Sequence, residues 1–222
     1  MFSGQGYNSG AVKKGLWIPV AILILASIAG YYKVVVPTRI RDNEREASRA
    51  LHQLSAAEAD FRANDRDDNH ANDFWTGDVA GLYYLRPKSG GNPPELKLIE
   101  RAIAEADAKP LQPRVPSPVP YHGYFFIALD EDDSTDGPKD RLYKRDTGGV
   151  PPMGKVHNES KFGFCAYPAE YGVTGRYTFI INENNTIFRA DLKGESTTHF
   201  PKDQSFGAPL YHSCPDPDEK PR

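Results

Sequence analysis

Cysteine is scarce in this sequence, with two residues among 222. Neither Cys165 nor Cys214 belongs to a C-x-x-C pair, so structural zinc sites and thiol redox catalysis have little support. An excess of basic residues is also missing, because the net charge is -3 and lysine and arginine are interleaved with acids. Without a concentrated basic face to bind phosphates, we expect no nucleic acid as a partner.

The usual catalytic motifs are absent too. The sequence has no H-E-x-x-H and no G-x-S-x-G, and GGVPPMGK lacks the spacing of a phosphate-binding loop. We therefore expect no enzymatic activity and no cofactor apart from calcium, discussed below. A remote alternative is a hydrolase site near Glu170 and His122, because Glu170 lies between two tyrosines at an expected strand end. The competing interpretation is a carboxylate that accepts hydrogen bonds in a turn.

The strongest positive feature is the charge-free apolar run from Leu16 to Tyr32. Its seventeen residues just suffice to cross a bilayer as a helix, with aromatic residues at both ends. No A-x-A cleavage pattern follows, so we predict a retained single-pass anchor over residues 16–36, after a polar tail at 1–15. The count of positive charges after the run favours a cytoplasmic domain, whereas long domains translocate regardless of nearby charge.

The rest of the chain changes from helical to strand periodicity. Apolar residues recur at three- and four-residue steps over residues 38–63 and again over 94–109, which predicts two helices inside a helical segment at 37–109. Short aromatic and β-branched runs at 121–200 predict an antiparallel sheet of about four strands. We expect an α+β fold in which the long helix packs on that sheet.

Three polar or proline-rich segments complete this organisation. Residues 110–120 form a polyproline-like spacer. Residues 130–160 are acidic and glycine-rich, and we expect them to form a surface loop. Residues 201–222 form a proline-rich tail, and a disulfide between Cys165 and Cys214 would attach this tail to the domain in an oxidising compartment. The alternative leaves Cys165 as a small core residue and Cys214 as incidental.

The segment NDRDDNHANDFWTGD, which begins at Asn64, offers candidate ligands for a cation. Asp65, Asp67, Asn69 and Asp73 stand at positions one, three, five and nine of an EF-hand-like loop, so their oxygens could bind calcium. The glycine and the bidentate acid that such a loop requires are replaced by His70 and Thr76. The alternative is a polar helix terminus whose Asp and Asn side chains bond the local backbone.

Two resemblances add to these patterns. The sequence KKG followed by LWIPVAILIL, together with the order of anchor, amphipathic helix and sheet, resembles type IV pilins and type II secretion pseudopilins. That resemblance implies processing between Gly15 and Leu16, although Val20 stands where those proteins carry a glutamate. It implies a structural role in a homo-oligomer or a secretion or pilus-type assembly.

The second resemblance rests on YHGYFF and AYPAEYGVTGRYTFIINENNTIF, between Tyr121 and Leu192. These segments resemble an uncharacterised bacterial extracytoplasmic domain family with YHGYxF and YPAEYGxSGxxTFIxN motifs. The resemblance implies that the bulk of the chain lies outside the cytoplasm. We therefore expect a membrane-anchored, non-catalytic extracytoplasmic protein with a pilin-like structural role. The alternative is an anchored binding or sensing module with a weak calcium loop.

Overall fold

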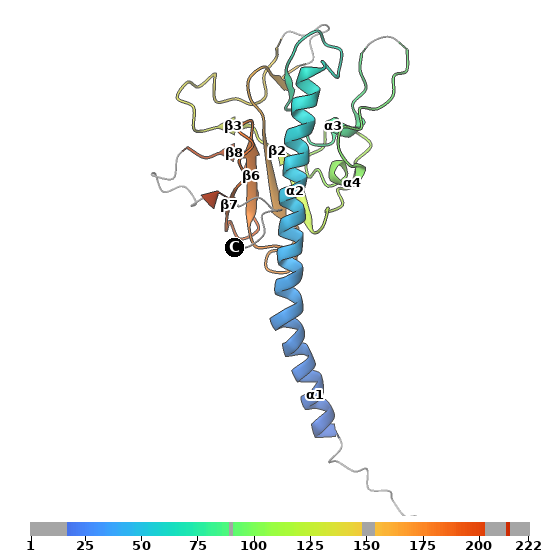
Figure 1. Cartoon of the computed structure of the whole chain (residues 1–222), viewed down its shortest axis with the longest axis vertical. Helices are drawn as coiled ribbons and strands as arrows, with labels where there is room; N and C mark the ends of the chain where they lie inside the picture. Colours follow the sequence, from blue (N-terminus) through green and yellow to red (C-terminus); the bar gives the residue numbers. More distant parts are fainter. Residues whose placement is uncertain (1–16, 89–90, 148–153, 203–211, 214–222) are drawn as a thin grey trace, which may run out of the picture. The chain divides into compact units, whose positions relative to one another are not determined.

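The computed structural model of the chain describes residues 17–88, 91–147, 154–202 and 212–213 (Figure 1). It divides into two compact units, Met1–Thr38 and Arg39–Arg222. The predicted processing site at Gly15 and Leu16 lies outside the described residues. Cys214 also lies outside them, so the disulfide stays a prediction.

The first unit contains the apolar helix. Helix α1 (Trp17–Gly30) is followed by a π-helical stretch, η1 (Tyr31–Val35), and then by α2 (Val36–Ala63). One helix among the described residues, from Ile22 onward, is long and apolar enough to cross a membrane. The large apolar side chains of α1 are between 45% and 66% exposed where the structure describes them: Val20, Ile22, Leu23, Ile24, Leu25 and Ile28. Within the first unit these apolar side chains are therefore exposed along the described length of α1.

In the second unit, α2 forms the centre of the core and confirms the helix expected from residue 38 to 63. Its buried positions return at helical spacing, and Leu51, Leu54 and Phe61 are completely shielded from solvent. The helix ends in a Schellman turn, because the Arg66 N–H donates to the Phe61 carbonyl at 3.2 Å and Asp65 takes a left-handed conformation with φ of 44°.

A five-stranded antiparallel sheet packs against α2, which confirms the α+β class. The strand order is β2-β5-β6-β7-β9. The strands are β2 (Tyr124–Ala128), β5 (Gly163–Pro168), β6 (Thr178–Asn182), β7 (Phe188–Ala190) and β9 (His212–Ser213). Alternate residues bury both faces: Phe164 joins the core around Leu51, while Cys165 belongs to a second cluster with Leu129 and Ile180.

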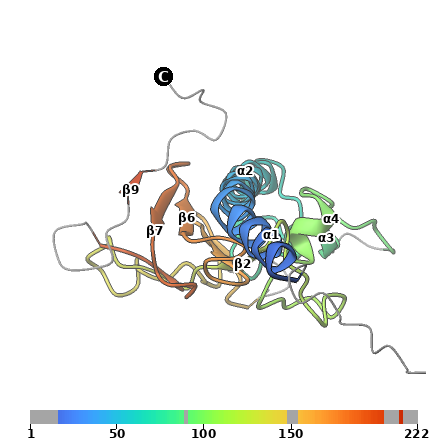
Figure 2. The same ribbon diagram turned by 90° about the horizontal axis from the view of Figure 1, so that it is seen from below.

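Short elements complete the unit. Helices α3 (Gly81–Tyr84) and α4 (Arg101–Ala104) lie on one side of α2, with β6 and β7 on the other (Figures 1 and 2). Strand β1 (Phe74–Trp75) pairs antiparallel with β4 (His157–Asn158). Strand β3 (Glu131–Asp132) pairs in parallel with β8 (His199–Phe200).

Three expectations need correction. The helix expected at 94–109 is wrong over most of its length, because helix α4 covers only Arg101–Ala104. The Leu96 and Leu98 N–H groups instead donate to the Leu85 and Leu82 carbonyls, so tertiary pairing overrides the helical periodicity. The tail expected at 201–222 contributes strand β9, whose residues bond to β7.

The segment at 130–160 is also more than a surface loop. It supplies β3 and β4, and the side chains of Asp132, Tyr143 and His157 are at most 3% exposed. These residues are buried because the backbone of the segment pairs with β1 and β8 and is drawn into the core. The burial of these side chains was not predicted because the segment is polar in composition.

Candidate functional site

Buried polar side chains gather where α2 ends, and they come from distant parts of the chain. Asp67 lies in the turn after α2, Asp73 lies just before β1, and His157 lies on β4. The β1 and β4 strands pair with Trp75 opposite His157, which brings the histidine back to the turn. We call Asp67, Asp73 and His157 the acid-histidine cluster.

The cluster is compact and closed to solvent. One ligand atom from each of its three residues lies within 4.8 Å of the others. The exposed fractions are 0% for Asp67, 1% for Asp73 and 0% for His157. His157 Nε2 lies 3.1 Å from Asp67 Oδ2. Such close approach of carboxylates and an imidazole in the core demands a proton or a cation between them.

Neighbouring groups orient Asp73. The Thr147 hydroxyl donates to Asp73 Oδ2 at 2.5 Å, and the Asn69 amide nitrogen lies 3.4 Å from both carboxylate oxygens. The Ala71 N–H donates to Asn69 Oδ1 at 2.7 Å, which fixes the amide with its nitrogen toward Asp73. Asn69 thus supports Asp73 as a hydrogen-bond donor.

Glu58 on α2 borders the cluster. Its Oε2 accepts the Trp75 N–H at 2.9 Å, and the side chain is completely buried. Burial raises the pKa of Glu58 well above its ordinary value, and the negative charge of Asp73 raises it further. Burial also raises the pKa of Asp73, although the Thr147 hydrogen bond opposes that shift.

Several polar atoms at this site lack a partner among the described residues. They are Glu58 Oε1, Asp67 Oδ1, Thr76 Oγ1 and His157 Nδ1. Most buried polar atoms in folded proteins are hydrogen-bonded, so a group of unsatisfied atoms around one cluster needs an explanation.

Two nearby carboxylates show the opposite pattern. Asp78 Oδ1 accepts the Trp75 indole N–H at 3.0 Å and the Gly81 N–H at 2.8 Å, and its Oδ2 accepts the Leu111 N–H at 2.6 Å. Asp107 accepts N–H groups from Val79, Ala80 and Lys109. Both carboxylates therefore hold loops in place, and every one of their oxygens accepts hydrogen bonds from the protein.

The predicted calcium ligands are divided by the fold. Asp67 and Asp73 meet, whereas the Asp65 carboxylate accepts the N–H groups of Asn69 and His70, each at 3.1 Å. Asp65 belongs to a separate, more exposed group with Asp68 and His70. Sequence spacing pointed to Asp67 and Asp73 but missed His157, which lies in the segment expected on the surface. Calcium binding stays a prediction.

Two other places were candidates for chemistry. Glu170 and His122 are both exposed, and among the described contacts no hydrogen bond or ion pair joins their side chains. The Glu170 backbone instead closes a turn: its N–H donates to the Thr174 hydroxyl at 3.0 Å, and its carbonyl accepts the Thr174 N–H. The segment is therefore a turn closed by backbone groups of Glu170, and the role of the Glu170 carboxylate stays a prediction.

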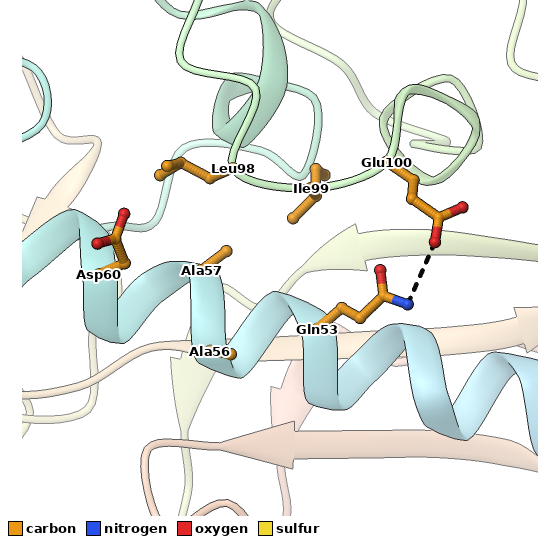
Figure 3. Close-up of a pocket in the computed structure, with 7 residues that line it drawn as sticks. All are labelled: Gln53, Ala56, Ala57, Asp60, Leu98, Ile99 and Glu100. Carbon is orange, nitrogen blue, oxygen red and sulfur yellow. Dashed lines mark hydrogen bonds between the residues drawn. The ribbon is translucent and has the colours of Figure 1, made fainter.

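A shallow groove of about 450 Å³ lies between α2 and residues 98–100 (Figure 3). Gln53 and Glu100 face each other across it, 3.4 Å apart. Asp60 on its edge is paired with Arg66, and this pairing lowers the pKa of Asp60. Its lining residues are Gln53, Ala56, Ala57, Asp60, Leu98, Ile99 and Glu100, and each of its two carboxylates has a hydrogen-bond partner.

Comparison with known proteins places the chain in a family. The sequence model of DUF2950, described as a protein of unknown function, matches residues 29–209. The chain belongs to the DUF2950 family. This confirms membership of an uncharacterised family, and the matched range includes the whole acid-histidine cluster. No curated protein and no solved structure matches the chain.

Proposed function

We propose that this DUF2950 protein is a single-pass membrane-anchored module that works by assembly or binding, without catalysis. Its second compact unit, Arg39–Arg222, which we call the folded unit, lies outside the cytoplasm in this proposal. The observation that carries the proposal is the exposure of the apolar side chains of α1, such as Leu23 at 66% and Leu25 at 65%. A helix with apolar residues on every described side is stable in water only when another apolar surface covers it, and a bilayer supplies that surface.

The structural form of this proposal is a pilin- or pseudopilin-like subunit that assembles with copies of itself or with secretion machinery. It is supported by the uninterrupted helical sequence from α1 through η1 to α2 and by the packing of α2 on an antiparallel sheet. The KKGL sequence at residues 13–16 adds the leader pattern. In this form the mature chain begins at Leu16.

A second candidate is a permanently anchored binding module. The acid-histidine cluster favours it, because a domain that served only as a spacer would have no need for unsatisfied buried carboxylates. A hydrolase around Glu170 has no comparable support.

Intact-mass analysis of the protein extracted from its native membrane separates the two forms. A chain that begins at Leu16 supports the pilin-like form, and N-methylation of that residue would strengthen it. A chain that keeps residues 1–15 rules the pilin-like form out and leaves the permanently anchored module. Release of the intact chain by alkaline carbonate would contradict both forms, because a spanning helix resists that extraction.

A further inference from the structure

We propose that Asp67, Asp73 and His157 bind one divalent transition-metal ion of the zinc or manganese class inside the folded unit. This inference goes beyond the proposed anchoring, since it concerns the folded unit alone and holds on either side of the membrane. It shares Asp67 and Asp73 with the calcium loop expected from sequence, but it has His157 in place of Asp65 and Asn69 and takes a different class of ion.

The first support is the geometry. In tetrahedral zinc sites the ligand atoms lie about 2.1 Å from the metal, so neighbouring ligand atoms are about 3.4 Å apart. His157 Nε2 and Asp67 Oδ2 are separated by 3.1 Å, and the Asp73 ligand atom lies within 4.8 Å of both. A small outward movement of the first pair and an inward movement of Asp73 would place all three around one ion.

The second support is the unsatisfied side-chain atoms. Asp67 Oδ1 has no hydrogen-bond partner among the described residues although the side chain is completely buried. Asp78 and Asp107, in the same part of the fold, have backbone donors on each carboxylate oxygen. Asp67 Oδ1 thus lacks the backbone hydrogen-bond donors that both oxygens of Asp78 and Asp107 have. A bound cation would supply the missing partner.

The third support is charge. Among the described ion pairs, neither Asp67 nor Asp73 has a lysine or arginine partner, and Asp67 is paired only with the His157 imidazole. Burying two carboxylates without compensating positive charge costs several kcal/mol. One divalent ion would neutralise both acids, and the hydrogen bonds from Thr147 and Asn69 would hold Asp73 in a ligating orientation, as outer partners do in metal sites.

The ligand chemistry selects the class of ion. Calcium and magnesium take oxygen ligands, whereas zinc and manganese accept an imidazole together with carboxylates. The pairing of β1 with β4 places His157 against Asp67, whereas the turn after α2 directs the Asp65 carboxylate to backbone N–H groups. A set of two carboxylates and one imidazole therefore favours a transition metal over calcium.

The test uses the full-length protein in detergent, stripped with chelator and then titrated separately with zinc, manganese, calcium and magnesium chlorides. Elemental analysis after dialysis gives the stoichiometry, and thermal unfolding gives the stabilisation. We expect one zinc or manganese ion per chain and a Tm rise of about 5 to 10 °C at a hundredfold excess over Kd. Cobalt as a zinc substitute should give visible absorption bands typical of nitrogen and oxygen ligands.

Matched variants locate the ion. His157→Gln and Asp67→Asn should each weaken zinc affinity by at least about 100-fold, since each removes a direct ligand and loss of an outer partner alone costs 10 to 100-fold. The control is His199→Gln, because Glu131, Asp133 and His199 also bring two carboxylates and an imidazole together, with the acids half-buried and the histidine exposed. His199→Gln should bind the ion as tightly as the unchanged protein.

When the variants fold, four outcomes would overturn the proposal. They are no retained ion in the unchanged protein, stabilisation by calcium but not by zinc or manganese, unaltered binding in His157→Gln, and loss of binding in His199→Gln. If the His157 or Asp67 variants fail to fold, the stoichiometry and the cobalt spectrum of the unchanged protein decide. A spectrum without d–d bands, or binding below one ion per chain, contradicts the site.

Discussion

His157 Nε2 lies 3.1 Å from Asp67 Oδ2, although the two residues are 90 positions apart in the sequence. The pairing depends on two very short strands, β1 and β4, and on the turn that ends α2. It joins the turn after α2 to the segment before β5. This contact therefore matters for stability whether or not a metal occupies the site.

Removing His157 tests that contribution. His157→Ala should lower the free energy of unfolding by about 3 to 5 kcal/mol, because it removes the His157 partner of the buried Asp67 carboxylate. Urea unfolding in the presence of chelator measures it. His199→Ala is the control, and its cost should stay within about 0.5 kcal/mol because that side chain is 47% exposed. Equal losses of unfolding free energy in the two variants would mean that the buried pair of His157 and Asp67 contributes no more to stability than the exposed His199 does.

Asp107 gives a pH dependence of defined sign. Burial, aided by the negative charge of Asp78, raises the pKa of Asp107 to about 6. The folded protein therefore holds this proton more tightly than the unfolded chain, whose aspartates titrate near pH 3.9. Stability from this group is fully present below about pH 4 and falls as the pH rises to 6, by about 2 to 3 kcal/mol.

The comparison of unchanged protein with Asp107→Asn isolates that effect, since other carboxylates titrate in both. Unfolding free energies measured from pH 4 to pH 7 should decline more steeply in the unchanged protein. Parallel curves for the two proteins would show that the pKa of Asp107 is not raised.

Gly81 has no room for a side chain beside Trp75. A Cβ at this position would lie 2.2 Å from Trp75 Nε1, and the Trp75 ring packs edge-on against His157 with centroids 5.3 Å apart. Gly81→Ala should therefore cost about 1 to 3 kcal/mol and also weaken zinc binding, by displacing the indole toward the histidine. Thermal unfolding and zinc titration measure the two effects.

Gly137→Ala is the matched control for this change. Its Cβ would come within 3.0 Å only of Asp140 Oδ2, at the end of a side chain that is 67% exposed and ion-paired with Arg145 at the surface. The control should keep both stability and zinc affinity. A Gly81→Ala protein with unaltered zinc affinity would show that the Trp75 ring does not position His157.

A charge in α1 should weaken membrane attachment. Leu23→Arg combined with Leu25→Arg introduces two charges, each costing about 2.5 to 3.5 kcal/mol at the centre of a spanning helix. Fractionation should move the double variant from the membrane toward the soluble fraction. Leu111→Arg is the control, because that leucine is 58% exposed but belongs to the folded unit. Retention of the double variant in the membrane would argue against α1 as the anchor.

Local periodicity was enough to predict the main elements. The three- and four-residue spacing of Leu51, Leu54 and Phe61 predicted α2, and the aromatic runs predicted β2, β5, β6 and β7. The same periodicity failed at 94–109, where the N–H groups of Leu96 and Leu98 donate to the carbonyls of residues 85 and 82 and hold the chain in a non-helical conformation. These contacts come from tertiary structure, which spacing along the chain does not encode.

The candidate site was only half visible in the sequence. Asp67 and Asp73 stood out in an Asp-rich turn, but His157 lay in a polar segment that gave no sign of burial. A two-residue strand such as β4 is too short to show alternation, and its pairing with β1 crosses more than 80 residues. Val156, the apolar residue before His157, was a weak sign in the sequence that this segment packs against the core. In the structure its carbonyl accepts the Thr76 N–H at 2.7 Å.

The location of the folded unit is the central claim, and protease accessibility in sealed membrane vesicles of known orientation tests it most directly. Added protease should degrade residues 39–222 in right-side-out vesicles and leave a short membrane-embedded fragment, while inside-out vesicles protect the folded unit. The opposite pattern, with the folded unit protected in right-side-out vesicles and degraded in inside-out vesicles, would place it in the cytoplasm and contradict the account.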